Sequence, residues 1–328
     1  MTRAVEASEL FECFGSSCAV LVTGDVPGCS AREAVAAARR DLRAWHVRFS
    51  RFIAHSELSA LNRSPYDTVG VSPLMARFAR SVRDAGSLSG GLVDATLARE
   101  IVSAGYAHDA SQLGCSVPLR RALELAPPRR PATPRRSAGW RLVEADLERA
   151  TVARPVGVML DSGGIAKGLF ADVLGERLAG HAAFAIVCGG DLRIGGAAER
   201  AREVHVESPF DGCTLQTFEL ERGGVATSGI GRRSWLGPRG APAHHLLDPS
   251  SGRPAFTGVV QATALAPTAL EAEVRAKAAL LGGPSAASEW LADGGVIVLD
   301  DGSHHAYPAS QRLNSTASSE PRVASPAL

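Results

Sequence analysis

The sequence of 328 residues has no run of about 20 apolar residues, the length that a helix needs to cross a bilayer. Its opening stretch, MTRAVEASELFECFG, has acidic residues where a signal peptide has an apolar core. It also lacks an excess of either charge, because 35 Lys and Arg residues face 34 Asp and Glu residues. This balance argues against general binding to nucleic acid or to an anionic membrane. We therefore expect a soluble, cytoplasmic protein without stable membrane insertion.

Paired cysteines are also missing. No two of the six cysteines form a Cys-x-x-Cys motif, and none stands with histidines at the spacing of zinc ligands. No local motif supports a catalytic thiol. We expect most of these residues to be small buried hydrophobic side chains in a reducing compartment.

Lysine is almost absent. Lys167 and Lys277 are the only two, so arginine supplies all the other basic residues. A bias of this kind is typical of a GC-rich genome, and chance survival of two lysines is one explanation. The other is that these two positions need a compact ammonium group, which a guanidinium group cannot replace.

The residues that are present allow a sizeable core, because 45% of them are hydrophobic. The length suits one large domain or two small ones, at about 100–200 residues per domain. Residues 31–52 and 72–87 have apolar side chains at helical spacing, and Ser72 and Pro73 suit the start of the second helix. Strand patterns often follow one another directly, which favours an α+β fold with largely antiparallel sheets. Strands are expected at 14–23, 155–160, 183–188, 203–207, 214–220, 258–266 and 295–299, with further helices at 165–179 and 268–281.

Two segments lack such patterns. Residues 126–139 are rich in proline and arginine, and we expect a solvated loop that does not pack, although its arginines could also bind an anion. Residues 303–328 are rich in Ser, Ala and Pro and are expected to form a disordered C-terminal tail. The folded domain is therefore expected to span residues 1–302.

The segment LDSGGIAKGLFAD (160–172) combines a strand end, a glycine turn and a helix start. Backbone N–H groups at a helix N-terminus bind anions, and Gly163 and Gly164 would let a phosphate approach the backbone. Lys167 lies in the first turn, where a cation opposes the helix dipole unless an anion or a carboxylate is close. The alternative is an ordinary turn between a strand and a helix, and the spacing alone does not decide between them.

Three further polar segments are equally open. In CGGDLRIGG (188–196), Asp191 either belongs to a hairpin or faces a ligand. ATSG (226–229) suits a phosphate or a ribose, but also a turn. In HHLLDPSSG (244–252), His244 and His245 point to opposite faces if the chain is extended, so that one could enter a cleft while the other meets solvent. A structural role for both is the alternative.

The helix expected at 268–281 has Thr268 as its cap and two pairs of opposite charge at i,i+4 spacing, Glu271/Arg275 and Glu273/Lys277. On a surface, each pair contributes about 0.2–0.5 kcal/mol to helix stability. That role accounts for the first pair. It accounts less well for the second, which contains one of the two lysines.

Taken in order, these segments resemble the FAD:protein FMN transferase (ApbE) family. The likeness covers about residues 10–302 and rests on several collinear motifs, none of which is decisive alone. The motifs are FGSSCAVLV, SELSALN, SGGLVDAT, LDSGGIAKGLFAD, CGGDLRIGG, VATSG, HHLLDPSSG and the helix at 268–281. The resemblance implies an α+β fold with two lobes around an FAD cleft.

The resemblance also implies roles for particular residues. His245 matches the histidine that takes the proton of the acceptor hydroxyl, with Lys167 and Lys277 as further candidates for catalysis. A base whose pKa lies near neutrality and cations on the phosphates both suit attack of an alcohol on a phosphoryl group. The other residues implied to bind the flavin nucleotide are Ser56, Glu57, Asn62, Asp94, Thr96, Asp161, Gly164, Thr227 and Ser228.

The sequence departs from the family in the last helix. The family pattern Ala-Asp-x-x-x-Thr supplies two magnesium ligands there, and the glycine turn, Gly164 in this chain, supplies a backbone carbonyl. Here the frame begins at Ala272 and has Glu273 and Lys277 at the ligand positions. Glutamate still offers hard oxygen ligands, whereas a charged lysine offers none and repels a divalent ion. Either Lys277 replaces the ion, or the site is lost and the protein binds FAD without transferring FMN.

The resemblance therefore predicts an enzyme that moves FMN from FAD to a Ser or Thr hydroxyl of an acceptor flavoprotein and releases AMP. FAD is the donor substrate, magnesium is a possible cofactor, and the acceptor is a protein and not a nucleic acid. The alternatives are an FAD pyrophosphatase, a non-catalytic FAD-binding protein and a flavin-free α/β enzyme. His245 favours catalysis, because a protein that only binds flavin has less need of a base.

Overall fold

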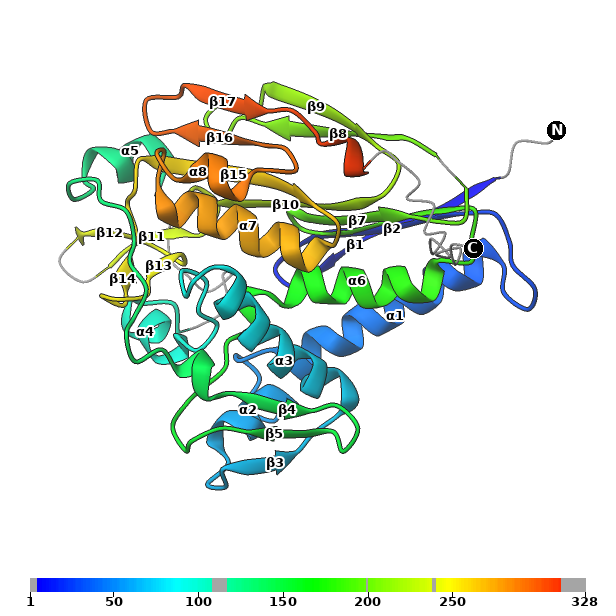
Figure 1. The fold of residues 1–328 in the computed structure, drawn as a ribbon, viewed down its shortest axis with the longest axis horizontal. Helices are drawn as coiled ribbons and strands as arrows, with labels where there is room; N and C mark the ends of the chain where they lie inside the picture. Colours follow the sequence, from blue (N-terminus) through cyan, green and yellow to red (C-terminus); the bar gives the residue numbers. More distant parts are fainter. Residues whose placement is uncertain (1–4, 108–116, 199, 238–239, 314–328) are drawn as a thin grey trace, which may run out of the picture.

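A computed structural model describes residues 5–107, 117–198, 200–237 and 240–313 (Figure 1). An eight-stranded sheet dominates this part of the chain, and each neighbouring pair of its strands is antiparallel. The α+β fold with antiparallel sheets is therefore confirmed. The order across the sheet is β1 (Glu6–Cys13), β2 (Ser16–Thr23), β6 (Ala183–Cys188), β7 (Asp191–Gly195), β10 (Gly223–Gly229), β15 (Val259–Ala266), β16 (Gly295–Leu299) and β17 (His304–Tyr307).

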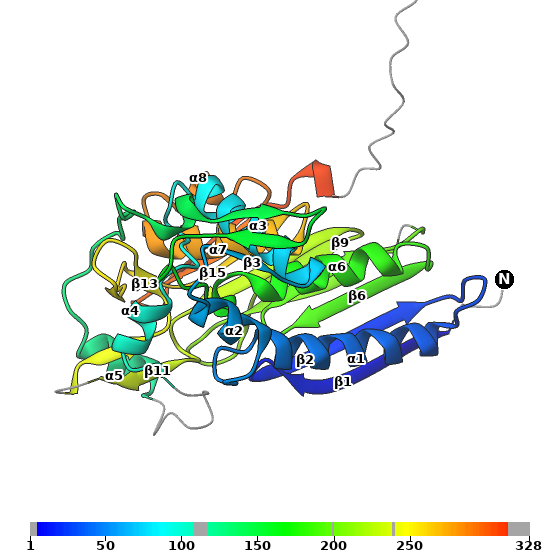
Figure 2. The same ribbon diagram turned by 90° about the horizontal axis from the view of Figure 1, so that it is seen from below.

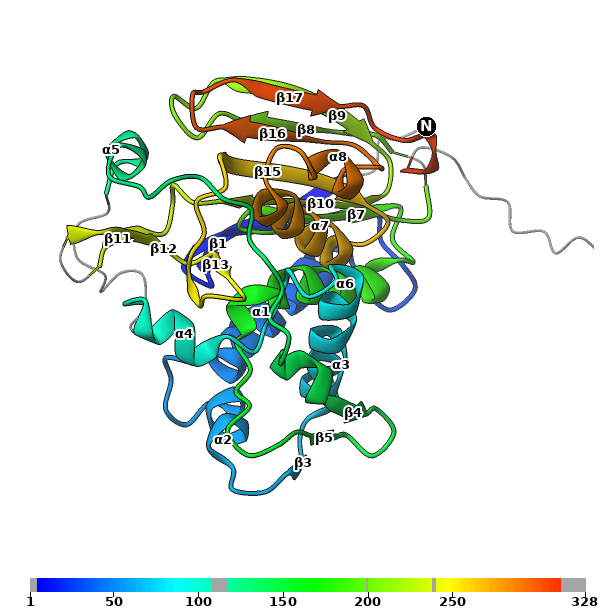
Figure 3. The ribbon, with the colours of Figure 1, turned by 60° about the vertical axis from the view of Figure 1, so that its left-hand side comes forward.

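The helices α1 (Ala31–Phe49), α6 (Ala166–Leu178) and α7 (Ala269–Gly282) cover one face of this sheet (Figures 1 and 3). Helix α1 packs on β1 and β2, as Figure 2 shows from below, while α6 packs on β6 and β7. Helix α7 packs on β10 and β15. These are the helices expected at 31–52, 165–179 and 268–281, and their apolar faces form much of the core.

A second layer lies beyond these helices. It contains α2 (Glu57–Arg63), α3 (Pro73–Leu88) and a small sheet in the order β3 (Thr68–Gly70), β5 (Thr151–Ala153), β4 (Glu144–Asp146). Because α3 contacts both α6 and α7, those two helices are covered from both sides, and most of their residues are buried. The remaining elements are α4 (Ala98–Ser103), α5 (Leu119–Glu124), α8 (Ala287–Trp290) and the strand pairs β8 (Arg202–Glu207) with β9 (Thr214–Leu220), β11 (Ser234–Leu236) with β12 (Pro242–His244), and β13 (Leu247–Asp248) with β14 (Arg253–Pro254).

The helix starts follow the expected chemistry. The Ser72 hydroxyl accepts a hydrogen bond from the Met75 N–H at 3.3 Å, and Pro73 is the first residue of α3. Thr268 caps α7 by accepting from the Glu271 N–H at 3.2 Å. Each cap satisfies a backbone donor that has no partner within its own helix.

Helices α6 and α7 approach each other closely at Gly168. A β-carbon at this position would lie 2.7 Å from the Ala269 carbonyl oxygen, which is too close for any side chain. The glycine therefore lets the first turn of α6 contact the first turn of α7. This contact brings Lys167 and Lys277 to the same carboxylate, that of Glu273.

Several strand predictions were wrong or missing. Residues 155–160 form no strand, because Pro155 and Gly157, whose φ is 94°, interrupt the extended backbone, leaving one isolated bridge between Leu97 and Met159. Strand β1 was not expected. The ATSG segment is part of the central strand β10, whose small residues fit under α7: a β-carbon on Gly224 would lie 2.3 Å from Thr268 backbone atoms.

The two segments without periodic patterns are better ordered than expected. Residues 126–138 have no helix or strand, but they pack: the Ala132 N–H donates to the Leu281 carbonyl at 2.8 Å and the Arg130 N–H to the Phe256 carbonyl at 2.9 Å. The predicted start of the disordered tail, at residue 303, lies too early in the chain. Strand β17 extends the main sheet, and Leu313 is only 2% exposed. Residues 314–328 lie outside the described part.

Cys13, Cys18 and Cys188 are buried as expected, whereas Cys29 is partly exposed and Cys213 is exposed. Cys115 lies outside the described residues. In the part of the chain that the structure describes, no helix is both long and apolar enough to cross a membrane.

Candidate active site

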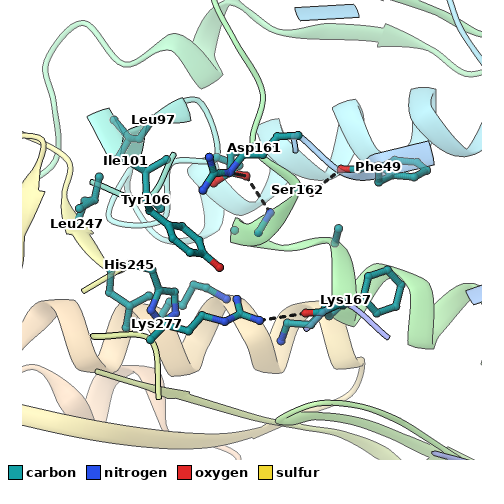
Figure 4. A pocket seen from close by; sticks show the side chains of 18 of the residues that line it. Phe49, Leu97, Ile101, Tyr106, Asp161, Ser162, Lys167, His245, Leu247 and Lys277 are labelled. Carbon is teal, nitrogen blue, oxygen red and sulfur yellow. Dashed lines mark hydrogen bonds and ion pairs between the residues drawn. The ribbon is translucent and has the colours of Figure 1, made fainter. Parts of the chain in front are cut away.

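A cavity of about 150 Å³ opens beside the first turn of α6, between the end of α1, the segment around α4 and the turn between β12 and β13 (Figure 4). It is lined largely by apolar and aromatic side chains, among them Phe49, Phe52 and Tyr106. Its charged lining residues are four cations, Arg51, Lys167, Arg233 and Lys277, and two anions, Asp94 and Asp161. The lining therefore presents more cationic than anionic side chains, together with aromatic surfaces, which suits an anionic ligand with a flat ring system.

The two lysines belong to one buried ionic cluster. Lys167 on α6 pairs with Asp191 on β7, and Lys277 on α7 donates to Glu273 Oε1 at 2.7 Å. Lys167 Nζ is also 3.9 Å from the same Glu273 oxygen, so one carboxylate lies between two ammonium groups. The Gly168 N–H donates to Glu273 Oε2 at 2.9 Å. Both oxygens of this carboxylate, which is 0% exposed, are thus already engaged.

The cluster keeps its charges although it is buried. Burial by itself would lower the pKa of Lys167, but Asp191 and Glu273 together hold it above its ordinary value. Burial would raise the pKa of Glu273, but the positive charges of Lys277 and Lys167 and the Gly168 N–H hold it below its ordinary value. Burial and the Glu273 charge raise the pKa of Asp191 to about 6, against the opposing effect of the lysines. Near neutral pH, Lys167 is therefore held charged by its carboxylate partners.

Arg51 faces the cavity from the other side. Its guanidinium group stacks on Phe52 and on Tyr106, with its central carbon 4.2 and 4.7 Å from the two ring centres. Its Nε lies 3.5 Å from an Asp161 oxygen, while Nη2 is buried without a hydrogen-bond partner among the described residues. The Asp161 carboxylate accepts from the Gly163 N–H at 3.1 Å, which fixes the glycine turn. A ligand in the cavity can satisfy this unpaired Arg51 donor.

Asp94 contributes a second unpaired atom. One of its oxygens accepts from the Thr96 N–H at 2.8 Å, while the other is buried without a partner among the described residues. Burial raises the pKa of the Asp94 carboxyl despite the Thr96 hydrogen bonds. The free oxygen can accept a hydrogen bond from a ring N–H or a hydroxyl group of a ligand.

The two histidines have separate environments. His245 lines the cavity, and its Nδ1 is buried and has no hydrogen-bond partner in the described part of the chain. Burial, together with the nearby positive charges of Arg233 and Lys277, lowers the pKa of His245 well below its ordinary value. The ring is therefore neutral near pH 7, although burial makes it a weaker base than a free imidazole.

His244 points away from the cavity lining. It is 1% exposed, its Nδ1 accepts from the Leu246 N–H at 3.3 Å, and its ring lies edge-on to Phe256 at 4.8 Å. Burial lowers the pKa of His244 from 6.5 to about 3. His245 thus enters the cavity as expected, but the expectation that the other histidine meets solvent is wrong, because His244 is buried and has a structural role.

This lowered pKa predicts how stability depends on pH. The unfolded chain binds a proton at His244 below about pH 6.5, but the folded protein does not, so the free energy of unfolding decreases as the pH falls from 6.5 towards 3. His244→Asn keeps an acceptor for the Leu246 N–H but cannot titrate. We expect it to reduce the slope by up to about 1.4 kcal/mol per pH unit in urea unfolding between pH 4.5 and 6.5. The exposed His205→Asn should leave the slope unchanged, and equal slopes in all three proteins would contradict the assignment.

The structure brings Asp94, Asp161, Gly164, Lys167, His245 and Lys277 to the cavity. The other candidates lie outside its lining and are engaged elsewhere. The Asn62 side-chain amide donates a hydrogen bond to the Leu160 carbonyl and accepts one from the Leu160 N–H, each with a donor–acceptor distance of 2.8 Å. The other residues with such positioning roles are Ser56, which caps α2; Glu57, which accepts from Ser72; Thr96, bonded to Asp94; Thr227, bonded to Thr263; Ser228, buried in β10; and Glu273, behind the lysines.

Arg51 and Arg233 were not singled out from the sequence. Arg51 lies in the RFSRFIAHSELSALNRSP segment, but its stacking partner Tyr106 is distant in the chain, and nothing local marks it among so many arginines. Arg233 follows the ATSG segment, which was interpreted as a phosphate site or a turn on the basis of its small residues. Its Nη2 donates to the Phe14 carbonyl at 3.1 Å, and both residues line the cavity.

Comparisons with known proteins agree with this fold. The ApbE family model matches residues 14–299. Among solved structures, an ApbE protein from Thermotoga maritima superposes with a TM-score of 0.74 at 24% identity, covering 92% of this chain and 97% of the other. A Pseudomonas stutzeri flavinyl transferase ApbE in its apo form gives 0.73 at 19% identity, with 95% and 98% covered. A Vibrio cholerae flavin transferase ApbE gives 0.67 at 19%, with 94% and 98% covered. No curated protein matches significantly.

Proposed function

The chain belongs to the ApbE family, and from that premise we propose that it is an FAD:protein FMN transferase. In this proposal it moves FMN from FAD to a Ser or Thr hydroxyl of an acceptor flavoprotein and releases AMP. The observation that carries the proposal is the placement of the neutral His245 in the same cavity as Lys167 and Lys277. A base and fixed cations at one place are what phosphoryl transfer to an alcohol requires.

The lining of the cavity offers groups that suit FAD. The diphosphate of FAD has two negative charges, and four cationic side chains line the cavity. Aromatic side chains from three separate segments, at 49–52, 106 and 170, provide flat surfaces for a flavin or adenine ring. The unpaired Arg51 Nη2 and the unpaired Asp94 oxygen offer one donor and one acceptor for polar groups of the same ligand.

The reaction follows from these groups. The acceptor hydroxyl oxygen attacks the phosphorus of the FMN half, and His245 takes the proton of that hydroxyl. The new bond joins the acceptor oxygen to the FMN phosphorus, and the bond from that phosphorus to the bridging oxygen breaks. The bridging oxygen leaves with AMP, and His245 then returns its proton to solvent. Lys167, Lys277 and Arg233 stabilise the charge that accumulates on the phosphate oxygens.

The acceptor is proposed to be a flavoprotein domain that faces the cytoplasm. Water in place of the acceptor hydroxyl would give FAD pyrophosphatase activity from the same groups. A protein without turnover would be a flavin-binding or flavin-delivery protein. These alternatives share the cavity and differ in their products.

The test is to incubate the purified protein with FAD and a flavoprotein domain that contains a Ser/Thr attachment site, and to measure AMP, free FMN and the acceptor mass. We expect an acceptor heavier by one FMN, with AMP in equal amount, and no change with the Ser/Thr→Ala acceptor. Equal amounts of free FMN and AMP with an unmodified acceptor would replace the proposal with hydrolysis. Tight FAD binding without AMP would replace it with a binding protein.

A further inference from the structure

The residues at the family's magnesium position do not fit a magnesium ion. The family pattern places an aspartate and a threonine where this chain has Glu273 and Lys277. Glu273 Oε1 accepts from Lys277 at 2.7 Å, and Oε2 accepts from the Gly168 N–H at 2.9 Å, so each oxygen already has a hydrogen-bond donor beside it. Lys277 has no lone pair to offer while it is charged. Two ammonium groups within 4 Å of one carboxylate oxygen also repel a divalent ion.

We propose that Lys277, held by Glu273, supplies the positive charge that magnesium would supply here, so that the protein binds FAD and transfers FMN without a divalent cation. This inference rests on the proposed function and defines the charge requirement of the same site. The order of groups supports it: Glu273 lies behind, and Lys277 lies between Glu273 and the cavity, which its side chain lines. One of its three N–H donors is bound to Glu273, which leaves others for phosphate oxygens.

The distribution of lysine supports the same inference. Every cation outside this cluster is an arginine, including those that pair with carboxylates on the surface. Both lysines of the chain lie within 4 Å of the same buried carboxylate oxygen, Glu273 Oε1. A guanidinium group is planar and broad, whereas an ammonium group is compact and directs its donors tetrahedrally, which is closer to a metal ion in size and shape. The cluster therefore uses lysine where a compact cation is an advantage.

Charge balance explains why Glu273 and Lys277 must be considered together. With Lys167, Lys277, Glu273 and Asp191 all charged, the cluster is neutral, and a bound divalent ion would give it two uncompensated charges in a buried place. Replacing Lys277 with threonine and Glu273 with aspartate removes one positive charge. The cluster then becomes anionic and regains the two oxygen ligands of the family pattern. This double variant should therefore need a metal.

The experiment measures FAD affinity by quenching of flavin fluorescence, in excess EDTA and in excess MgCl2. For the unaltered protein we expect the two affinities to agree within about twofold, because Lys277 is part of the chain and EDTA cannot remove its charge. For Glu273→Asp/Lys277→Thr we expect FAD to bind at least about tenfold more tightly in magnesium than in EDTA. Metal analysis of the gel-filtered proteins should find magnesium retained only by the double variant when FAD is present.

Lys277→Met and Lys277→Arg are the matched single variants. Methionine keeps the length of the side chain without its charge, and we expect FAD affinity to fall about tenfold or more, in EDTA and in magnesium alike. Arginine keeps the charge in a broader group, and its affinity should be intermediate and independent of magnesium. Circular dichroism checks that each variant is folded.

The chelator experiment on the unaltered protein needs no variant, so a folding failure does not remove the test. Tighter FAD binding or faster AMP release in magnesium than in EDTA would overturn the inference, while the proposed transfer reaction would stand. Absence of FAD binding under both conditions would instead overturn the proposed function. The two failures are therefore distinguishable in the same titration.

Discussion

Replacing His245 with alanine is expected to slow FMN transfer by about 10²–10⁴-fold, because that is the usual contribution of a general base to a proton-transfer step. The ring lines the cavity, is neutral, and has a buried Nδ1 without a partner among the described residues. Its loss should change FAD affinity little, because the diphosphate is held by the cations of the site. A large fall in kcat with an unchanged dissociation constant for FAD is therefore the expected signature.

The measurement is single-turnover AMP release with saturating FAD and acceptor, together with an FAD titration of each variant. The control is His205→Ala, which removes an exposed histidine from β8, far from the cavity lining. If His245→Ala loses FAD affinity as much as it loses rate, the histidine binds substrate and is not the base.

The pH dependence gives a second readout of the same assignment. A base works only when it is unprotonated, and the pKa of His245 lies well below its ordinary value in the protein without substrate. The acid limb of kcat/KM should therefore fall below pH 6.5, and the profile should be flat through that value. A midpoint of the kcat/KM profile near pH 6.5 that disappears in His245→Ala would support His245 as the base but contradict its lowered pKa.

Local chemistry was readable from the sequence where one short segment contains all of it. The start of α6 beside Lys167 and the cap of α7 at Thr268 each depend on residues within one or two turns. The pair Glu273/Lys277 depends only on i,i+4 spacing, and it forms as expected. Such patterns fix neighbours along a helix regardless of what packs around it.

Contacts between distant segments were not readable in this way. Asp191 was ambiguous from the sequence because its partner Lys167 is on another element, and the pair forms only when β7 and α6 pack together. Arg51 was missed for the same reason, since its stacking partner Tyr106 follows α4. Pairing decided by the tertiary fold leaves no trace in local spacing.

Family roles were least transferable for the residues that cap and clamp. Ser56 and Asn62 were expected at the nucleotide, but their side chains bond backbone groups of the protein, Ser56 at the start of α2 and Asn62 at Leu160. A polar side chain in a turn satisfies backbone groups as readily as a ligand, and sequence does not separate the two uses. Their direct contact with FAD stays a prediction, whereas their effect on the cavity follows through the backbone that they hold.

Replacing Lys167 with methionine is expected to lower the free energy of unfolding by about 3–5 kcal/mol, because it removes one partner of a buried charge pair and leaves the other uncompensated. Asp191 is 1% exposed, and among the described residues Lys167 is the cation that pairs with it directly, while Lys277 pairs with Glu273 and acts on Asp191 through its charge alone. The loss should depend on pH. Without Lys167 the pKa of Asp191 rises further above its present value of about 6, so the folded variant takes up a proton that the unfolded chain does not bind.

The sign follows from this difference in proton binding. A carboxyl group whose pKa is raised by folding stabilises the folded state at low pH and loses that contribution as the pH rises through the raised pKa. Urea unfolding of Lys167→Met should therefore show a larger deficit at pH 8 than at pH 5.5. The control is Arg77→Met, which breaks the exposed pair with Glu176 on the same helix α6 and should cost at most about 1 kcal/mol at either pH. Equal losses in the two variants would mean that the buried cluster contributes no more than a surface ion pair, and that Lys167 is retained only for the ligand that it faces.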